Sequence, residues 1–232
     1  MGEVLKPEVG FVADYQNHLT SVFNFPMHYA IRRVWQNGES MRQISSLFSE
    51  EEQTFKDVDA LGLFVDNHDL PRFLNEHKFK QHEFLSALVF SLTARGIPFF
   101  YQGSELAYDG GADPWNREAM WPEIYGSSYH RIADCTSKVN RVRKQFKIWD
   151  FPYEEKIVSD SFMAYTRGRV LVALTNTHAT QVFTVANSPF RNEKVCNIFW
   201  ADDCVTVGDT GALQVHLIGA EPKVFVPQNM IQ

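Results

Sequence analysis

The chain has 232 residues, of which 44% are hydrophobic and 22% charged, a balance typical of folded globular proteins rather than disordered ones. Its 22 basic and 28 acidic side chains give a formal net charge of −6, so no basic stripe is expected and nucleic acid is an unfavoured partner. Polar residues or glycine interrupt every apolar stretch well short of the ~20 residues of a membrane helix, and the opening residues lack the apolar run of a secretory signal. We therefore expect neither a membrane span nor a leader in this sequence.

Three short apolar runs in the first part of the chain predict strands. They cover residues 22–25, 61–65 and 97–101 and follow one another at nearly equal intervals. Two helices are predicted among them: residues 84–92, closed by Gly96 at the C′ position, and residues 132–146, whose apolar side chains repeat on one face. Apolar strands that alternate with helices favour βαβ units and a parallel sheet buried on both faces.

From about Tyr153 the pattern changes to short strands joined by tight turns. The predicted strands cover residues 162–165, 169–175, 182–186, 195–200, 205–207, 213–217 and 224–226. We place a boundary at Phe151-Pro152, which gives an α/β domain at 1–150 and an all-β antiparallel sandwich at 151–232. Cys196 and Cys204 allow two interpretations, a disulfide across neighbouring strands or two buried free thiols.

Polar segments follow the predicted strands. Residues 66–69 (DNHD) follow the second run, residues 102–105 and then 110–117 follow the third, and Glu3 lies at the start of the chain. Functional side chains collect at the carboxyl ends of parallel strands. Carboxylates at several such ends, without a phosphate loop or a metal-spaced histidine pair, favour acid–base chemistry on a neutral polyhydroxylated substrate. Taken alone, the 66–69 segment is more typical of a capped turn facing solvent, so the interpretation depends on the combination.

Four motifs together resemble the α-amylase family of retaining glycoside hydrolases. Residues 64–69 (FVDNHD), with 71–73 (PRF) after them, are similar to a family signature, and residues 2–5 (GEVL) to its general-acid motif. Residues 96–105 (GIPFFYQGSE) are similar to its eighth barrel strand, and residues 110–118 (GGADPWNRE) to the substrate-binding loop of fungal-type members. The order and spacing of all four agree with the family, and the terminal β-domain resembles its domain C.

The resemblance implies roles for five residues. Glu3 would be the general acid/base that protonates the glycosidic oxygen, and Asp69 would stabilise the oxocarbenium-like transition state. His68 would donate to a hydroxyl of the same sugar. Asp113 and Arg117 would bind the next glucose on the non-reducing side. These residue types suit a retaining mechanism, which needs a protonated and an ionised carboxyl group about 5–5.5 Å apart.

The chain departs from the family at its beginning. The family's nucleophile lies in an Arg-x-Asp motif after the fourth strand, and no such motif precedes Glu3. Asp14 and Asp66 do not match that motif and are expected to be structural. A complete barrel needs about 250 residues, so we expect the C-terminal part of a (β/α)8 TIM barrel, about strands 6–8. Calcium would belong to the complete family enzyme, whose ligands lie mostly outside this chain, and no metal site is expected within it.

The resemblance therefore implies an α-amylase-type hydrolase that cuts internal α-1,4-glucosidic bonds of starch or glycogen, with this chain catalytically incomplete and inactive alone. Two alternatives stay open: a non-catalytic product that binds glucan, and a related α-glucosidase or transglycosylase. The expected partners are α-glucans, and the expected state is a monomer. The family resemblance alone suggests that the protein is secreted or lies in a digestive vacuole.

Overall fold

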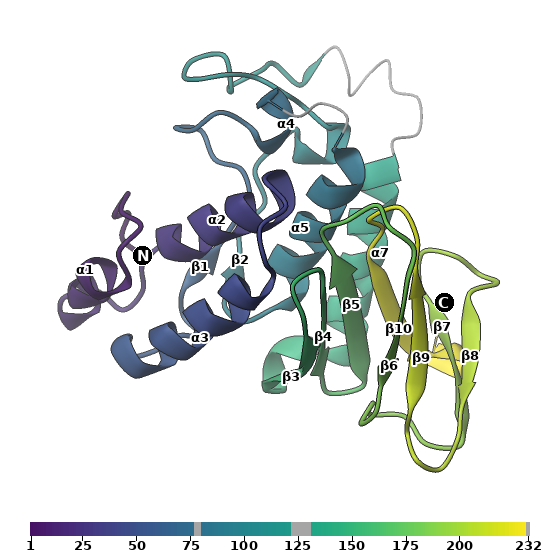
Figure 1. Cartoon of the computed structure of the whole chain (residues 1–232). Helices are drawn as coiled ribbons and strands as arrows, with labels where there is room; N and C mark the ends of the chain where they lie inside the picture. Colours follow the sequence, from purple (N-terminus) through teal and green to yellow (C-terminus); the bar gives the residue numbers. More distant parts are fainter. Residues whose placement is uncertain (77–79, 122–130, 231–232) are drawn as a thin grey trace.

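The computed structural model describes residues 1–76, 80–121 and 131–230, and shows a largely helical part packed beside a part made of antiparallel strands (Figure 1). The helices are α1 (Val9–Asp14), α2 (Phe25–Ile31) with a π-helical turn η2 (Arg32–Gln36) after it, α3 (Arg42–Thr54), α4 (Phe73–Glu76), α5 (Gln81–Thr93) and α7 (Arg131–Phe146). The strands are β1 (Gly62–Leu63), β2 (Ile97–Pro98), β3 (Tyr153–Val158), β4 (Phe162–Arg167), β5 (Val170–Thr175), β6 (Gln181–Val185), β7 (Glu193–Asn197), β8 (Cys204–Val207), β9 (Leu213–Leu217) and β10 (Lys223–Pro227). No helix in these described ranges is long and apolar enough to cross a membrane.

Four segments of the first part run parallel to one another. Gly2 pairs with Val22, Phe23 pairs with Gly62, and β1 pairs in parallel with β2. We call these four segments the parallel row. Among the described residues its only regular sheet has two strands, β1 and β2, and the other two pairings are single bridges, so the row is not a closed barrel. The carboxyl ends of parallel segments lie at one edge, so the polar segments that follow them meet there.

The first predicted strand, residues 22–25, is wrong in its extent. Only Val22 and Phe23 bridge to neighbours, and Phe25 already begins α2. The reason is local: Asn24 Oδ1 accepts a hydrogen bond from the Met27 amide at 2.9 Å, and Pro26 occupies the first turn. Both features favour the start of a helix. The regular strands β1 and β2 are likewise shorter than the predicted runs at 61–65 and 97–101.

The helix α5 is buried almost all round because it packs against α7, η2, β2 and β5. Every residue from 83 to 93 is buried. The C-cap of α5 is Ala94. Gly96 therefore lies at C″, one position beyond the C′ position predicted for it. Its φ is +99°, and a Cβ there would lie 2.6 Å from the Leu61 carbonyl oxygen. The helix α7 buries the predicted face, which includes Ile132 and Val139.

The second part forms two antiparallel sheets. One has six strands in the order β3-β4-β5-β10-β7-β8, and the other pairs β6 with β9. The strands β4 to β10 fall on the seven predicted segments, while β3 was not predicted. Buried side chains of both sheets pack together, including Phe162 and Leu171 from the larger sheet and Leu213 and Val215 from the smaller one. The hairpin of β4 and β5 turns at Gly168, whose φ is +58°.

The two parts of the chain share a hydrophobic core. One cluster of buried residues contains Trp35 and Phe90 from the helical part and Tyr165 and Val172 from the sheet. The Trp35 indole also donates a hydrogen bond to the carbonyl oxygen of Thr175 at 3.2 Å. The six-stranded sheet therefore packs against the helices of the first part.

The structure forms a disulfide between Cys196 and Cys204, which are paired positions of β7 and β8. Of the two interpretations of the sequence, the pair of free thiols is therefore wrong. Cys135, on α7, is a buried free thiol.

Candidate active site

A pocket of about 170 Å³ opens where the parallel segments end. Its wall is mostly aromatic: Phe23, Phe25, Phe64, Phe99, Phe100 and Tyr101. The Phe23 ring meets the Phe99 ring edge-on with 4.7 Å between centroids. Glu3 and His68 line the same pocket, so the structure brings two of the five predicted site residues to one cavity.

The backbone of Gly2 holds the segment that carries Glu3. The Gly2 amide donates to the Ser21 carbonyl at 2.8 Å, and the Phe23 amide donates to the Gly2 carbonyl at 2.9 Å. The next side chain, Val4, is buried in a small cluster of apolar residues, while Glu3 itself is exposed. The sequence therefore holds an accessible carboxyl group at the mouth of an aromatic pocket.

The other predicted residues form a chain of charged contacts that begins at His68. His68 Nε2 lies 3.4 Å from Asp69 Oδ1, and Arg117 Nη2 lies 3.6 Å from the same oxygen. Arg117 Nε donates to Asp113 Oδ1 at 2.8 Å and to the His68 carbonyl oxygen at 3.2 Å. These four side chains are between 34% and 53% exposed, so they can reach a ligand. The structure thus joins residues that lie far apart in the sequence.

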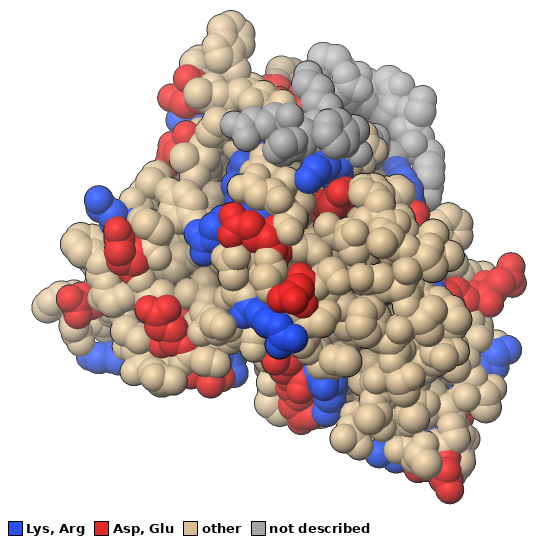
Figure 2. All heavy atoms as spheres, in the orientation of Figure 1, with Lys and Arg blue, Asp and Glu red and all other residues tan. Residues whose placement is uncertain are grey.

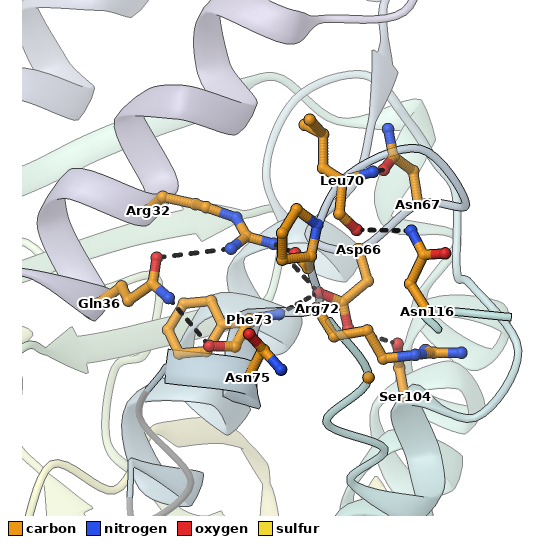
Figure 3. A network of polar contacts seen from close by, with 12 residues as sticks. Arg32, Gln36, Asp66, Asn67, Leu70, Arg72, Phe73, Asn75, Ser104 and Asn116 are labelled. Carbon is orange, nitrogen blue, oxygen red and sulfur yellow. Dashed lines mark hydrogen bonds and ion pairs between the residues drawn. The ribbon is translucent and has the colours of Figure 1, made fainter. Parts of the chain in front are cut away.

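Asp66 does not belong to the exposed group, although it lines the pocket. Its carboxylate accepts hydrogen bonds from the Phe73 amide at 2.8 Å and from Ser104 Oγ at 3.0 Å, and Arg32 Nη2 lies 3.6 Å away (Figure 3). Burial raises the pKa of Asp66, and Arg32 opposes that shift. Through these contacts Asp66 attaches the segment of His68 and Asp69 to neighbouring parts of the fold, which is a structural role.

The sequence interpretation gave no role to three residues that connect the two polar segments. Arg72 is fully buried and donates from Nε to Glu118 Oε2 at 2.7 Å and from Nη2 to the Gln102 carbonyl at 2.9 Å. Asn116, also fully buried, donates to the Leu70 carbonyl at 2.9 Å (Figure 3). All three lie within the motifs quoted above, but a motif does not show which of its residues contact one another.

Two buried titratable side chains contact residues in or next to the pocket wall. His28 stacks on the Phe64 ring with 4.7 Å between centroids, and burial lowers its pKa to about 3. Glu51 Oε1 accepts a hydrogen bond from Asn24 Nδ2 at 2.8 Å, and burial raises the pKa of Glu51 to about 8. At neutral pH the uncharged form of both groups is therefore favoured.

The described residues contain no group of three or more His, Cys, Asp or Glu side chains that could hold a metal ion. On the face shown in Figure 2, acidic and basic side chains are interspersed.

The model of the family described as "Alpha amylase, catalytic domain" matches residues 1–151. The chain belongs to the α-amylase family. Across 97% of its length it is 33% identical to the "Beta/alpha-amylase" of Paenibacillus polymyxa, of which it covers 19%. It is 30% identical to "Alpha-amylase 1" of Schwanniomyces occidentalis, with all of this chain and 47% of that protein covered. The solved structure of an α-amylase from Malbranchea cinnamomea superimposes on 99% of the chain with a TM-score of 0.91 and 27% identity.

The α-amylase family has a TIM-barrel fold, and this chain contains part of it. The chain spans about half the length of the Schwanniomyces protein and 50% of the Malbranchea chain. The resemblance read from four motifs is therefore confirmed as a family relationship that extends through the terminal sheets.

Proposed function

We propose that these residues form the acid and substrate-binding side of an α-amylase-type active site that cleaves internal α-1,4-glucosidic bonds. One observation carries the proposal: His68, Asp69, Asp113 and Arg117 are joined by charged contacts beside the pocket that Glu3 lines. Carboxylate acceptors and cationic donors together suit the hydroxyl groups of a sugar. The aromatic wall offers apolar surface to the sugar rings.

In this proposal Glu3 is the general acid that protonates the glycosidic oxygen. Asp69 and His68 hold hydroxyl groups of the sugar whose bond is broken, and Asp113 with Arg117 holds the next glucose. A retaining mechanism also needs a second carboxylate at about 5–5.5 Å as nucleophile. Among the described residues that line the pocket, Asp66 is the other carboxylate, and it is buried and hydrogen-bonded to the Phe73 amide and Ser104, so we propose that residues 1–232 bind glucan without hydrolysing it.

The proposed organisation is a partial catalytic barrel at 1–150 followed by a β-sandwich domain at 151–232. Two observations support this division: the family model ends at residue 151, and β3 begins at Tyr153. The shared core around Trp35 and Tyr165 makes the second domain a support for the first. Calcium, in this proposal, is bound by parts of the family enzyme other than these residues, and the chain is a monomer.

Binding of maltoheptaose, measured by isothermal titration calorimetry, tests the proposal. We expect Arg117→Ala to weaken binding by about tenfold or more, because charge-assisted hydrogen bonds contribute roughly 1–3 kcal/mol each. The matched control is Arg169→Ala: Arg169 is 50% exposed against 47% for Arg117, and it pairs with Glu193 far from the site. Equal affinities for the two variants, or no binding by the unmodified chain, would contradict the proposed function.

A further inference from the structure

The loop of residues 110–118 carries Asp113 and Arg117 but contains no regular helix or strand. Its position relative to residues 67–70 decides whether Arg117 can contact Asp69. The contacts that fix this position come from three residues outside the exposed site: Arg72, Asn116 and Glu118.

Glu118 binds two donors at once. Its Oε1 accepts from the Gly110 amide at 2.7 Å, which closes the loop on itself, and its Oε2 accepts from Arg72 Nε at 2.7 Å, which attaches the loop to the neighbouring segment. A Cβ at Gly110 would lie 2.1 Å from the Trp115 carbonyl oxygen and 2.5 Å from Glu118 Oε1, so only glycine fits this closure. Each donor meets a different oxygen of the carboxylate, and in an amide one of these oxygens would be an NH2 group that faces a donor with another donor.

Arg72 connects this loop to the pocket wall. Its guanidinium lies 4.4 Å from the centroid of the Tyr101 ring, which lines the pocket, and its amide donates to the Gly110 carbonyl at 3.0 Å. The Tyr101 hydroxyl donates in turn to the Asn116 carbonyl at 3.2 Å. Because Arg72 is fully buried, the Glu118 carboxylate is also the counter-charge that its burial requires.

We propose that the Arg72–Glu118 ion pair positions the 110–118 loop so that Asp113 and Arg117 face Asp69 and His68 in one glucan-binding subsite. This inference rests on the proposed function. Glu118 is a positioning residue: it contacts Gly110 and Arg72, and it acts on a ligand through Arg117.

The test is Glu118→Gln, which keeps the shape of the side chain but leaves one acceptor oxygen for two donors. We expect faster amide hydrogen exchange in residues 110–118 of the ligand-free chain and about a fivefold loss of maltoheptaose affinity. The matched control is Glu193→Gln, because Glu193, on β7, is also 26% exposed and also pairs with an arginine, Arg169 in the turn between β4 and β5. The control should change neither measurement.

A double-mutant cycle separates positioning from general destabilisation. In an Arg117→Ala background, Glu118→Gln should cost less than about twofold in affinity, since the group it positions is gone. An undiminished loss in that background would overturn the inference, as would unchanged exchange in the single variant. If the unmodified chain bound no maltoheptaose, the proposed function would fail instead, and the exchange result would still decide whether Glu118 holds the loop.

Discussion

Glu51 and Asn24 show how a single buried contact supports the pocket. Asn24 caps α2 through its side-chain oxygen, and its amide nitrogen donates to Glu51, whose side chain is almost fully buried. Phe23 and Phe25, on either side of Asn24, both line the pocket. A change in the charge of Glu51 therefore acts on Asn24, which lies in the sequence between two residues of the pocket wall.

Burial raises the pKa of Glu51 from an ordinary 4.5 to about 8; Arg95 opposes this shift and Glu50 adds to it. Below pH 4.5 folded and unfolded chains both carry the proton. Between pH 4.5 and 8 the unfolded chain releases it while the folded chain keeps it, so this group makes the free energy of unfolding fall as the pH rises through that window. Above pH 8 the folded chain must hold a buried charge.

We therefore expect Glu51→Gln to flatten this dependence. Between pH 5 and pH 8 its free energy of unfolding should fall by roughly 3 kcal/mol less than that of the unmodified chain. Urea denaturation at several pH values measures the difference. Glu154→Gln, at an exposed position on β3, should keep the original slope, because Glu154 does not act on Glu51. A Glu51→Gln variant with the original slope would show that Glu51 does not titrate in this range.

At the scale of elements, β7 and β8 form a hairpin at the edge of the larger sheet, and the disulfide between Cys196 and Cys204 joins its strands. The disulfide closes a short loop, with a sequence separation of 8 residues. Short loops restrict the unfolded chain less than long ones, so the stabilisation is at the lower end of the usual range.

We expect the double variant Cys196→Ser, Cys204→Ser to lose about 2 kcal/mol of unfolding free energy. Urea denaturation of the oxidised chain with and without a reducing agent provides the comparison. Reduction should lower the stability of the unmodified chain to that of the variant and leave the variant unchanged. If reduction had no effect on the unmodified chain, the two cysteines would not be linked in solution.

At the scale of the whole molecule, the parallel row and the antiparallel sheets depend on each other. Arg167, on β4, donates to the carbonyl oxygens of Ala94 at 2.6 Å and Phe151 at 2.8 Å, which joins the sheet to the end of α5 and to the connection between the two parts. In contrast, Ile97 of β2 and the following Phe99 and Phe100 are between 36% and 44% exposed. Apolar residues are therefore buried where the first part meets the sheet, and several are exposed to solvent at β2.

We expect residues 1–232, expressed alone, to release no reducing sugar from starch. The other carboxylate among the described residues that line the pocket of Glu3 is Asp66, which is buried and hydrogen-bonded, and a lone acid gives little acceleration. The assay needs Glu3→Gln as its control, because activity that persists in this variant comes from a contaminating enzyme. Activity that Glu3→Gln abolishes would mean that another carboxylate acts as the nucleophile.

Local sequence alone determined much of this protein. The alternation of apolar runs and helices predicted parallel segments followed by antiparallel strands, and the face of α7 followed directly from its periodicity. The motifs around Glu3, Asp69 and Arg117 identified the family, since their order and spacing are properties of sequence. Local rules also explain the main error in extent: the cap at Asn24 and Pro26 starts α2 inside a run that is apolar enough for a strand.

Tertiary structure decided which residues meet. Asp69 and Arg117 lie 3.6 Å apart, and Arg72 and Glu118 lie 2.7 Å apart, although 48 and 46 positions separate them in the chain. The same holds for the choice between a disulfide and two thiols, which depended on the register of β7 against β8. Periodicity and propensity act over a few residues, whereas loop position depends on burial and on buried charges that find partners from other segments. For this reason the sequence predicted the candidate site residues, and only the fold showed which contacts hold them in place.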